Sequence, residues 1–195
     1  MSTSERTSPT PLLIRGAVYG MVAGMAMAMF AMVASVTFQH HGFFTPLFHI
    51  SALLGSPDAM MTSVSQSMAG HHFWFAAGPA LLGLMIHMVT GATYGMVFGL
   101  MTRRLRRSLI IPAGMAYGLA VFVVSSFIGL PIAAKLTGSG AVITDMARMV
   151  GWSTFAIEHL MFGTVLGLLT FTLIRVPSDG AGPDTPVERR STIPA

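Results

Sequence analysis

Residues 16–38 read GAVYGMVAGMAMAMFAMVASVTF and carry no charged side chain. As an α-helix this segment would be about 35 Å long, which is enough to cross a hydrocarbon core of about 30 Å. The apolar region of a cleaved signal peptide is shorter, at about 7–15 residues. The segment therefore predicts a membrane-spanning helix rather than a leader that is removed.

Three further segments of the same kind follow, at 75–101, 109–131 and 152–174. Of the 195 residues, 53% are hydrophobic and 9% charged, whereas about 25% are charged in an average soluble domain. None of the segments alternates as barrel strands do. We predict an all-α integral membrane protein whose four-helix bundle (15–176) lies in a lipid bilayer, with disordered tails at 1–14 and 177–195.

Basic residues predict how the bundle is oriented, because Lys and Arg are retained on the cytoplasmic side of a membrane. Nine of them precede the first span, follow the last, or lie between the second and third: Arg6, Arg15, Arg103, Arg104, Arg106, Arg107, Arg175, Arg189 and Arg190. The other two connections hold only Lys135 and Arg148. Both termini are therefore predicted to be cytoplasmic.

Glycine recurs at every fourth residue in each span, which places the glycines on one face of each helix. Small residues on such a face let two helix backbones approach closely in lipid. The glycines predicted to pack helices together are Gly20, Gly24, Gly91, Gly95, Gly118, Gly163 and Gly167. Packing explains them fully, so we assign them no chemistry.

The spans also match in pairs, which predicts two helical hairpins related as parallel repeats. The first span carries GAVYG at 16–20 and the third carries GMAYG at 114–118. In the second and fourth spans, His87 and His159 each lie 16 residues before an arginine. At about 24 Å from those arginines, both histidines would lie in the outer leaflet at the same depth.

Each of these histidines continues a glycine row, so both should point into the bundle. Glu158 is adjacent to His159 in the chain. Ionisable side chains inside a membrane are costly and usually face partners or a water-filled cavity, which makes His87, His159 and Glu158 a candidate site. The alternative is structural, because an imidazole can also hold two helices together by hydrogen bonding across them.

A second group of histidines lies in the connection between the first two spans. His40 and His41 stand at its beginning, and His71 and His72 at its end. Imidazole is a common ligand of copper and zinc, and thioether sulfur suits Cu(I). The first span also carries methionines on one face: Met21, Met25, Met29 and Met32. Packing in the core or against lipid is the favoured explanation of this stripe, and metal handling is the alternative.

We therefore predict that the protein binds or passes a small cation, with copper favoured, through an outer-leaflet His/Glu/Met site. The predicted metal ligands are His87, His159, Glu158, His40, His41, His71 and His72. One alternative is a non-catalytic accessory or assembly subunit of a larger membrane complex, or a homo-oligomer. Another is a small membrane protein holding haem b between two histidines, although closely packed glycine rows leave little room for a porphyrin.

Several classes of site are excluded by what the sequence lacks. There is no cysteine, so thiolate metal sites, iron–sulfur clusters and cysteine nucleophiles are excluded. Zinc-protease, nucleophile-elbow and phosphate-loop motifs are also missing, and no motif for binding nucleic acid is present. We predict no catalytic residue.

Two shorter helices are predicted in the outer connections. Ser56-Pro57-Asp58 has the residues of a helix start, and Met60, Val64 and Met68 then recur every fourth residue. This pattern predicts a helix at 56–69 that lies on the membrane surface. The stretch 144–150 is predicted to do the same.

The last span contains Gly151-Trp152, Glu158-His159, Gly163 and Gly167. In these residues it resembles the last span of several uncharacterised small bacterial membrane-protein families that have four helices and a His-x-x-x-Gly signature. The resemblance extends over the four spans and implies the same fold and a location in the bacterial inner membrane. It implies no activity.

Overall fold

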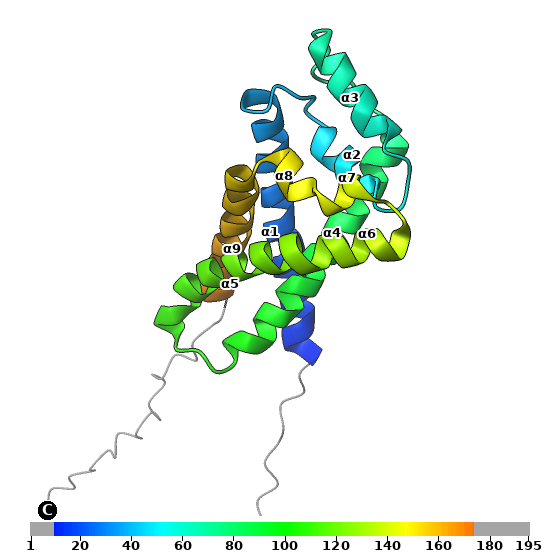
Figure 1. Ribbon diagram of the computed structural model, residues 1–195. Helices are drawn as coiled ribbons and strands as arrows, with labels where there is room; N and C mark the ends of the chain where they lie inside the picture. Colours follow the sequence, from blue (N-terminus) through cyan, green and yellow to red (C-terminus); the bar gives the residue numbers. More distant parts are fainter. Residues whose placement is uncertain (1–9, 174–195) are drawn as a thin grey trace, which may run out of the picture.

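The computed structural model describes residues 10–173, which form helices and contain no strand. Four helical segments are long and apolar enough to cross a membrane. They are Thr10–Thr37 (α1), Ala77–Thr102 (α4), the composite segment Arg107–Thr137, and Trp152–Leu173 (α9). The all-helical architecture with four apolar spans is therefore as predicted, and it fits a multi-pass membrane protein (Figure 1).

Helix α1 begins six residues before the predicted span, at Thr10. Pro11 suits the first turn of a helix, where its missing N–H would have no partner. Arg15 is exposed, and a long basic side chain near a helix end can reach the polar interface. Residues 10–14 are thus helical and not part of a disordered tail. Residues 1–9 and 177–195, the rest of the predicted tails, lie outside the described residues.

The third span is longer and less regular than predicted. It comprises a 3₁₀ turn at Arg107–Leu109 (η1), α5 at Ile110–Val124, a π-helical turn at Ser125–Gly129 (η2) and α6 at Leu130–Thr137. Pro131 has no N–H to donate to the preceding turn, and the wider π turn lies just before it. At 31 residues the segment exceeds the thickness of a bilayer core, so it must tilt. Figure 1 shows it crossing α4 and α1 obliquely.

Each hairpin is held together at its glycines, because α1 packs along α4 and α5 packs along α9. A Cβ atom added to Gly20 would lie 2.8 Å from Gly95 Cα, and one added to Gly163 would lie 2.8 Å from Gly118 Cα. These distances leave no space for a side chain. The other glycines of the predicted rows also face the partner helix of the hairpin: Gly24, Gly91 and Gly167.

The two hairpins are similar but not equivalent. Gly20 packs between Gly91 and Gly95 as Gly114 packs between Gly163 and Gly167. In this packing Gly20 corresponds to Gly114. Aligning the GAVYG and GMAYG motifs would instead pair Gly20 with Gly118, one helical turn further along. In addition, α1 lies along α9, whereas α4 and α5 touch at few positions. The packing therefore departs from a strict two-fold relationship.

The connections between spans gather at one end of the bundle. The first contains α2 (Thr45–Ser51) and α3 (Asp58–Met68), and the second contains α7 (Ala141–Thr144) and α8 (Met146–Val150). In Figure 1 they lie opposite the turn between α4 and α5, at which end α1 begins and α9 ends. The helices predicted at 56–69 and 144–150 are confirmed in α3 and α8, while their position on a membrane surface stays a prediction.

Candidate functional site

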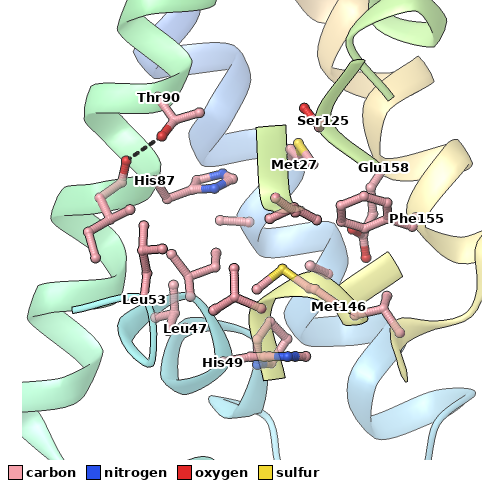
Figure 2. A pocket seen from close by; sticks show the side chains of 18 of the residues that line it. Met27, Leu47, His49, Leu53, His87, Thr90, Ser125, Met146, Phe155 and Glu158 are labelled. Carbon is pink, nitrogen blue, oxygen red and sulfur yellow. Dashed lines mark hydrogen bonds between the residues drawn. The ribbon is translucent and has the colours of Figure 1, made fainter. Parts of the chain in front are cut away.

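A cavity of about 360 Å³ lies between the two hairpins. Its walls come from α1, α4, the α5–η2–α6 segment and α9, and its roof comes from α2, α3, α7 and α8. We call this cavity the chamber (Figure 2). Because both hairpins contribute walls, residues far apart in the sequence meet around one space.

The floor of the chamber is a cluster of buried apolar side chains. Ala23, Phe98, Phe162 and Leu166 form this cluster, and each is no more than 3% exposed. Beside it, the Tyr117 hydroxyl donates a hydrogen bond of 2.8 Å to the backbone oxygen of Tyr94. The floor thus closes the chamber toward the end that carries the α4–α5 turn.

The roof is made of two apolar clusters, one from each connection. The first is centred on the fully buried Phe48 of α2, and the second on Ile143 of α7. Two hydrogen bonds tie the connections to each other. The His49 ring bonds to Val142 O at 2.8 Å, and Gln39 Nε2 donates to Val150 O at 3.0 Å.

Glu158 is the one acidic side chain among the residues that line the chamber. It lies on α9 and is only 4% exposed. Within the described part of the chain, no hydrogen bond or ion pair involves its carboxyl group, and no lysine or arginine lines the chamber. Figure 2 shows Glu158 on the wall opposite His87. A carboxyl placed in this way must either keep its proton or face a cation supplied by a ligand.

His87 and His159 both line the chamber, and each is anchored to a backbone oxygen. His87 Nε2 lies 2.9 Å from Gly24 O on α1, and His159 Nδ1 lies 2.8 Å from Phe155 O on its own helix. A carbonyl oxygen only accepts hydrogen bonds, so the ring nitrogen at each contact carries the proton. In the neutral rings, Nδ1 of His87 and Nε2 of His159 are left as acceptors.

His49 is a third histidine of the chamber, and it is absent from the predicted site. Its ring is 5% exposed and donates through Nε2 to Val142 O. Burial lowers the pKa of His49, and this outweighs the opposing effect of the hydrogen bond. The Thr45-Pro46 pair does signal a helix start before it. No pattern in the sequence indicates that α2 folds back over the bundle.

The two outer histidine pairs come close to each other at Ser67, but they do not form one site. Ser67 Oγ donates a hydrogen bond to His40 O at 2.9 Å. The same Ser67 oxygen then accepts a hydrogen bond from His72 Nδ1, also at 2.9 Å. His41 lines the chamber, and burial together with neighbouring His40 lowers its pKa. His71 and His72 line a separate shallow hollow beside Trp74.

The predicted metal ligands are therefore divided between places. His41, His87, His159 and Glu158 line the chamber, whereas the other three lie outside it. Among residues 10–173, no three His, Asp or Glu side chains converge as they would around a bound metal ion.

The methionine stripe of the first span does not line the chamber. Met21, Met25 and Met29 are between 37% and 47% exposed on the outside of α1, and Met32 is buried in the roof. These positions agree with the packing interpretation. The chamber receives its thioethers from other methionines: Met27, Met60, Met146 and Met149.

Comparison of the chain with protein-family models, curated proteins and solved structures finds no match. The chemistry of the chamber is therefore what indicates a function. Its charged group is a carboxyl, and its histidines offer lone pairs. Such a lining suits a ligand that brings positive charge or hydrogen-bond donors.

Proposed function

We propose that this protein is an integral membrane protein that binds a small cation in the chamber. The observation that carries the proposal is the Glu158 carboxyl, buried in an apolar cavity with no partner in the described chain. Leaving a carboxylate unpaired inside a membrane is costly, and a bound cation removes that cost. In the absence of the cation the carboxyl holds a proton.

The histidines support the same proposal. Nδ1 of His87 and Nε2 of His159 can accept a hydrogen bond from a cation or coordinate it. With no lysine or arginine in the lining, nothing competes with the ligand for the carboxyl group. The chamber thus provides one negative charge and several neutral acceptors.

The proposal is tested by equilibrium binding to the full chain in lipid nanodiscs, using benzyltrimethylammonium and Cu(I) as probes. Wild type should bind at least one of them, and Glu158→Gln should weaken that binding by at least about tenfold. Asp145→Asn is the matched control, because Asp145 is exposed and does not line the chamber. Binding of neither probe, or equal loss in both variants, would contradict the proposal.

A copper ion is the second candidate, and the anchoring of the imidazoles favours it. Metal-binding histidines usually donate their other N–H to a carbonyl or carboxylate, as His87 and His159 do. Met27 and Met146 add thioether sulfur to the same lining. A copper ion would draw these ligands together from their separate walls.

Elemental analysis of the purified protein tests the copper proposal. Wild type should retain copper stoichiometrically, and His87→Gln with His159→Gln should abolish this retention. The control pair, His71→Gln with His72→Gln, alters histidines outside the chamber. Loss of copper only in the control pair would place the metal in the outer connection and contradict a chamber site.

We also propose that both termini are cytoplasmic, that the hairpins arose as a parallel repeat, and that the membrane is a bacterial inner membrane. The orientation is supported by the nine basic residues at the predicted cytoplasmic ends of the spans, compared with two in the outer connections. The repeat is supported by the similar glycine packing of the two hairpins. This arrangement would place the chamber beneath the outer surface.

A further inference from the structure

The size and lining of the chamber indicate what kind of cation it holds. Its volume of about 360 Å³ falls within the range of about 300–1,000 Å³ that is typical of sites for small organic molecules. Most of the lining side chains are apolar, and no three His, Asp or Glu side chains converge among the described residues. These features suit a cation that has an apolar body better than a bare metal ion.

Aromatic side chains lie in the same lining as the carboxyl group. Phe155 and Phe162 come from α9, one turn on either side of Glu158, and Tyr94 comes from α4. Aromatic faces attract ammonium groups, and this attraction strengthens when water is excluded. A lining that holds both a carboxyl group and aromatic rings is therefore suited to an organic ammonium head.

The chamber reaches the surface of the bundle between α4 and the third span. Residues of α4 and of α5–η2–α6 line the chamber from facing sides, yet α4 and α5 touch at few positions. The Tyr94 hydroxyl of α4 lies 3.2 Å from Ser125 Oγ of η2 and bridges the two sides one turn from Thr90, so the gap lies on the roof side of this hydrogen bond. Thr90 of α4 lines the chamber and is also exposed. It lies about 20 Å along the helix from Arg103, which is a depth inside the hydrocarbon core.

The chamber has a second exposed lining residue, Met149, which belongs to the roof. There the hydrogen bond from Gln39 to Val150 O crosses from the first connection to the second. The opposite side of the bundle is sealed, because α1 lies along α9. The gap beside Thr90 is thus the route that leads directly to lipid.

We infer that the chamber takes an organic ammonium compound with an apolar body, which enters from the bilayer between α4 and the third span, beside Thr90. This inference rests on the proposed cation-binding function and names the class of cation. An amphiphilic ammonium compound partitions into the membrane with its apolar body in the hydrocarbon core, which is the depth at which Thr90 lies.

The ligand class is tested with two probes of the same shape, measured on the full chain in nanodiscs. Benzyltrimethylammonium carries the charge, and neopentylbenzene replaces its nitrogen with carbon. Wild type should bind the ammonium compound at least about tenfold more tightly than the hydrocarbon, and Glu158→Gln should remove this preference. Equal binding of the two probes would overturn the inference.

The route is tested by the association rate of benzyltrimethylammonium. Thr90→Trp should slow association at least about tenfold, because the ring fills the gap. Val89→Trp places the same ring on α4 at an exposed position that does not line the chamber. Association should be unchanged in that control and in Met149→Trp. Slowing in Met149→Trp but not in Thr90→Trp would overturn the lateral route.

The outcomes also separate this inference from the proposed function. Glu158-dependent binding of Cu(I) without binding of either organic probe would overturn the ammonium inference and leave cation binding standing. Binding of no cation at all would overturn both. A Thr90→Trp protein that fails to fold is replaced by Ala133→Trp, which lines the same gap from α6.

Discussion

At the scale of single residues, the chamber depends on polar groups whose hydrogen bonds are only partly used. His49, His87 and His159 each donate one ring N–H to a backbone oxygen and keep an acceptor nitrogen. Glu158 has no such anchor in the described chain. The fixed donors hold the rings in place, so the free acceptors and the carboxyl group remain available to a ligand.

His49 provides a prediction on pH. Burial lowers its pKa in the folded protein, so between this value and about 6.5 the unfolded chain binds a proton that the native chain does not. Stability should therefore fall as the pH decreases below about 6.5. His49→Gln keeps a donor for Val142 O and cannot be protonated, so it should lose less stability on acidification.

Thermal unfolding at about pH 7.5 and about pH 5.5 measures this difference on either side of the ordinary histidine pKa of about 6.5. His71→Gln serves as the control, because His71 is exposed. The explanation fails if His49→Gln and wild type lose the same stability on acidification, or if His71→Gln protects equally well.

Residue-level patterns in the sequence identified part of the lining and missed part of it. His87, His159 and Glu158 are ionisable residues in apolar spans. They can be recognised in the sequence because burying such a side chain in lipid costs free energy. His49 and Met146 lie in short helices whose place over the bundle depends on tertiary packing. Local sequence does not encode such packing.

At the scale of helices, glycine determines how closely the helices of each hairpin approach. Gly163 shows this most directly, because a Cβ there would lie 2.8 Å from Gly118 Cα and still closer to Gly114 O. Both neighbours are backbone atoms, which cannot rotate away. We expect Gly163→Ala to destabilise the protein by about 1–3 kcal/mol through overpacking.

Thermal or denaturant unfolding in detergent measures the effect, with Gly78→Ala as the control. Gly78 also lies in a spanning helix, but a Cβ there would meet nothing within 4 Å. Equal stability of Gly163→Ala and Gly78→Ala would show that the hairpins are not held by these contacts.

The four spans could be predicted because an apolar run of more than 20 residues forms a membrane-spanning helix in almost every case. Their ends were less predictable. Arg15 suggests that the first helix begins after it, yet α1 begins five residues earlier, at Thr10. The π turn at Ser125–Gly129 also has no clear signal except Pro131, which can be accommodated in several ways.

At the scale of the whole molecule, the unequal contact between hairpins creates the chamber. The packing of α1 along α9 covers one side, while α4 and α5 touch at few positions and the Tyr94–Ser125 hydrogen bond joins α4 to the third span, which leaves this side more open. The motif matches predicted two hairpins. They did not predict this asymmetry, because it depends on the tilt of the third span.

The proposed orientation can be tested cleanly because the chain has no cysteine. Ser108→Cys lies in η1 and Ser65→Cys lies in α3, and both positions are exposed. In intact cells a membrane-impermeant maleimide should label Cys at 65 and should label Cys at 108 only after permeabilisation. The reverse pattern would invert the topology.

The central claim is that the Glu158 carboxyl contacts a cation inside the chamber. Infrared difference spectroscopy of the full chain in nanodiscs tests it directly, by recording the carboxyl stretching bands before and after benzyltrimethylammonium or Cu(I) is added. We predict that one of these cations converts a protonated carboxyl band into a carboxylate band in wild type and in Asp145→Asn, and that the change is missing in Glu158→Gln. Bound cation with no change in the carboxyl bands, or the same change in Glu158→Gln, would contradict the claim.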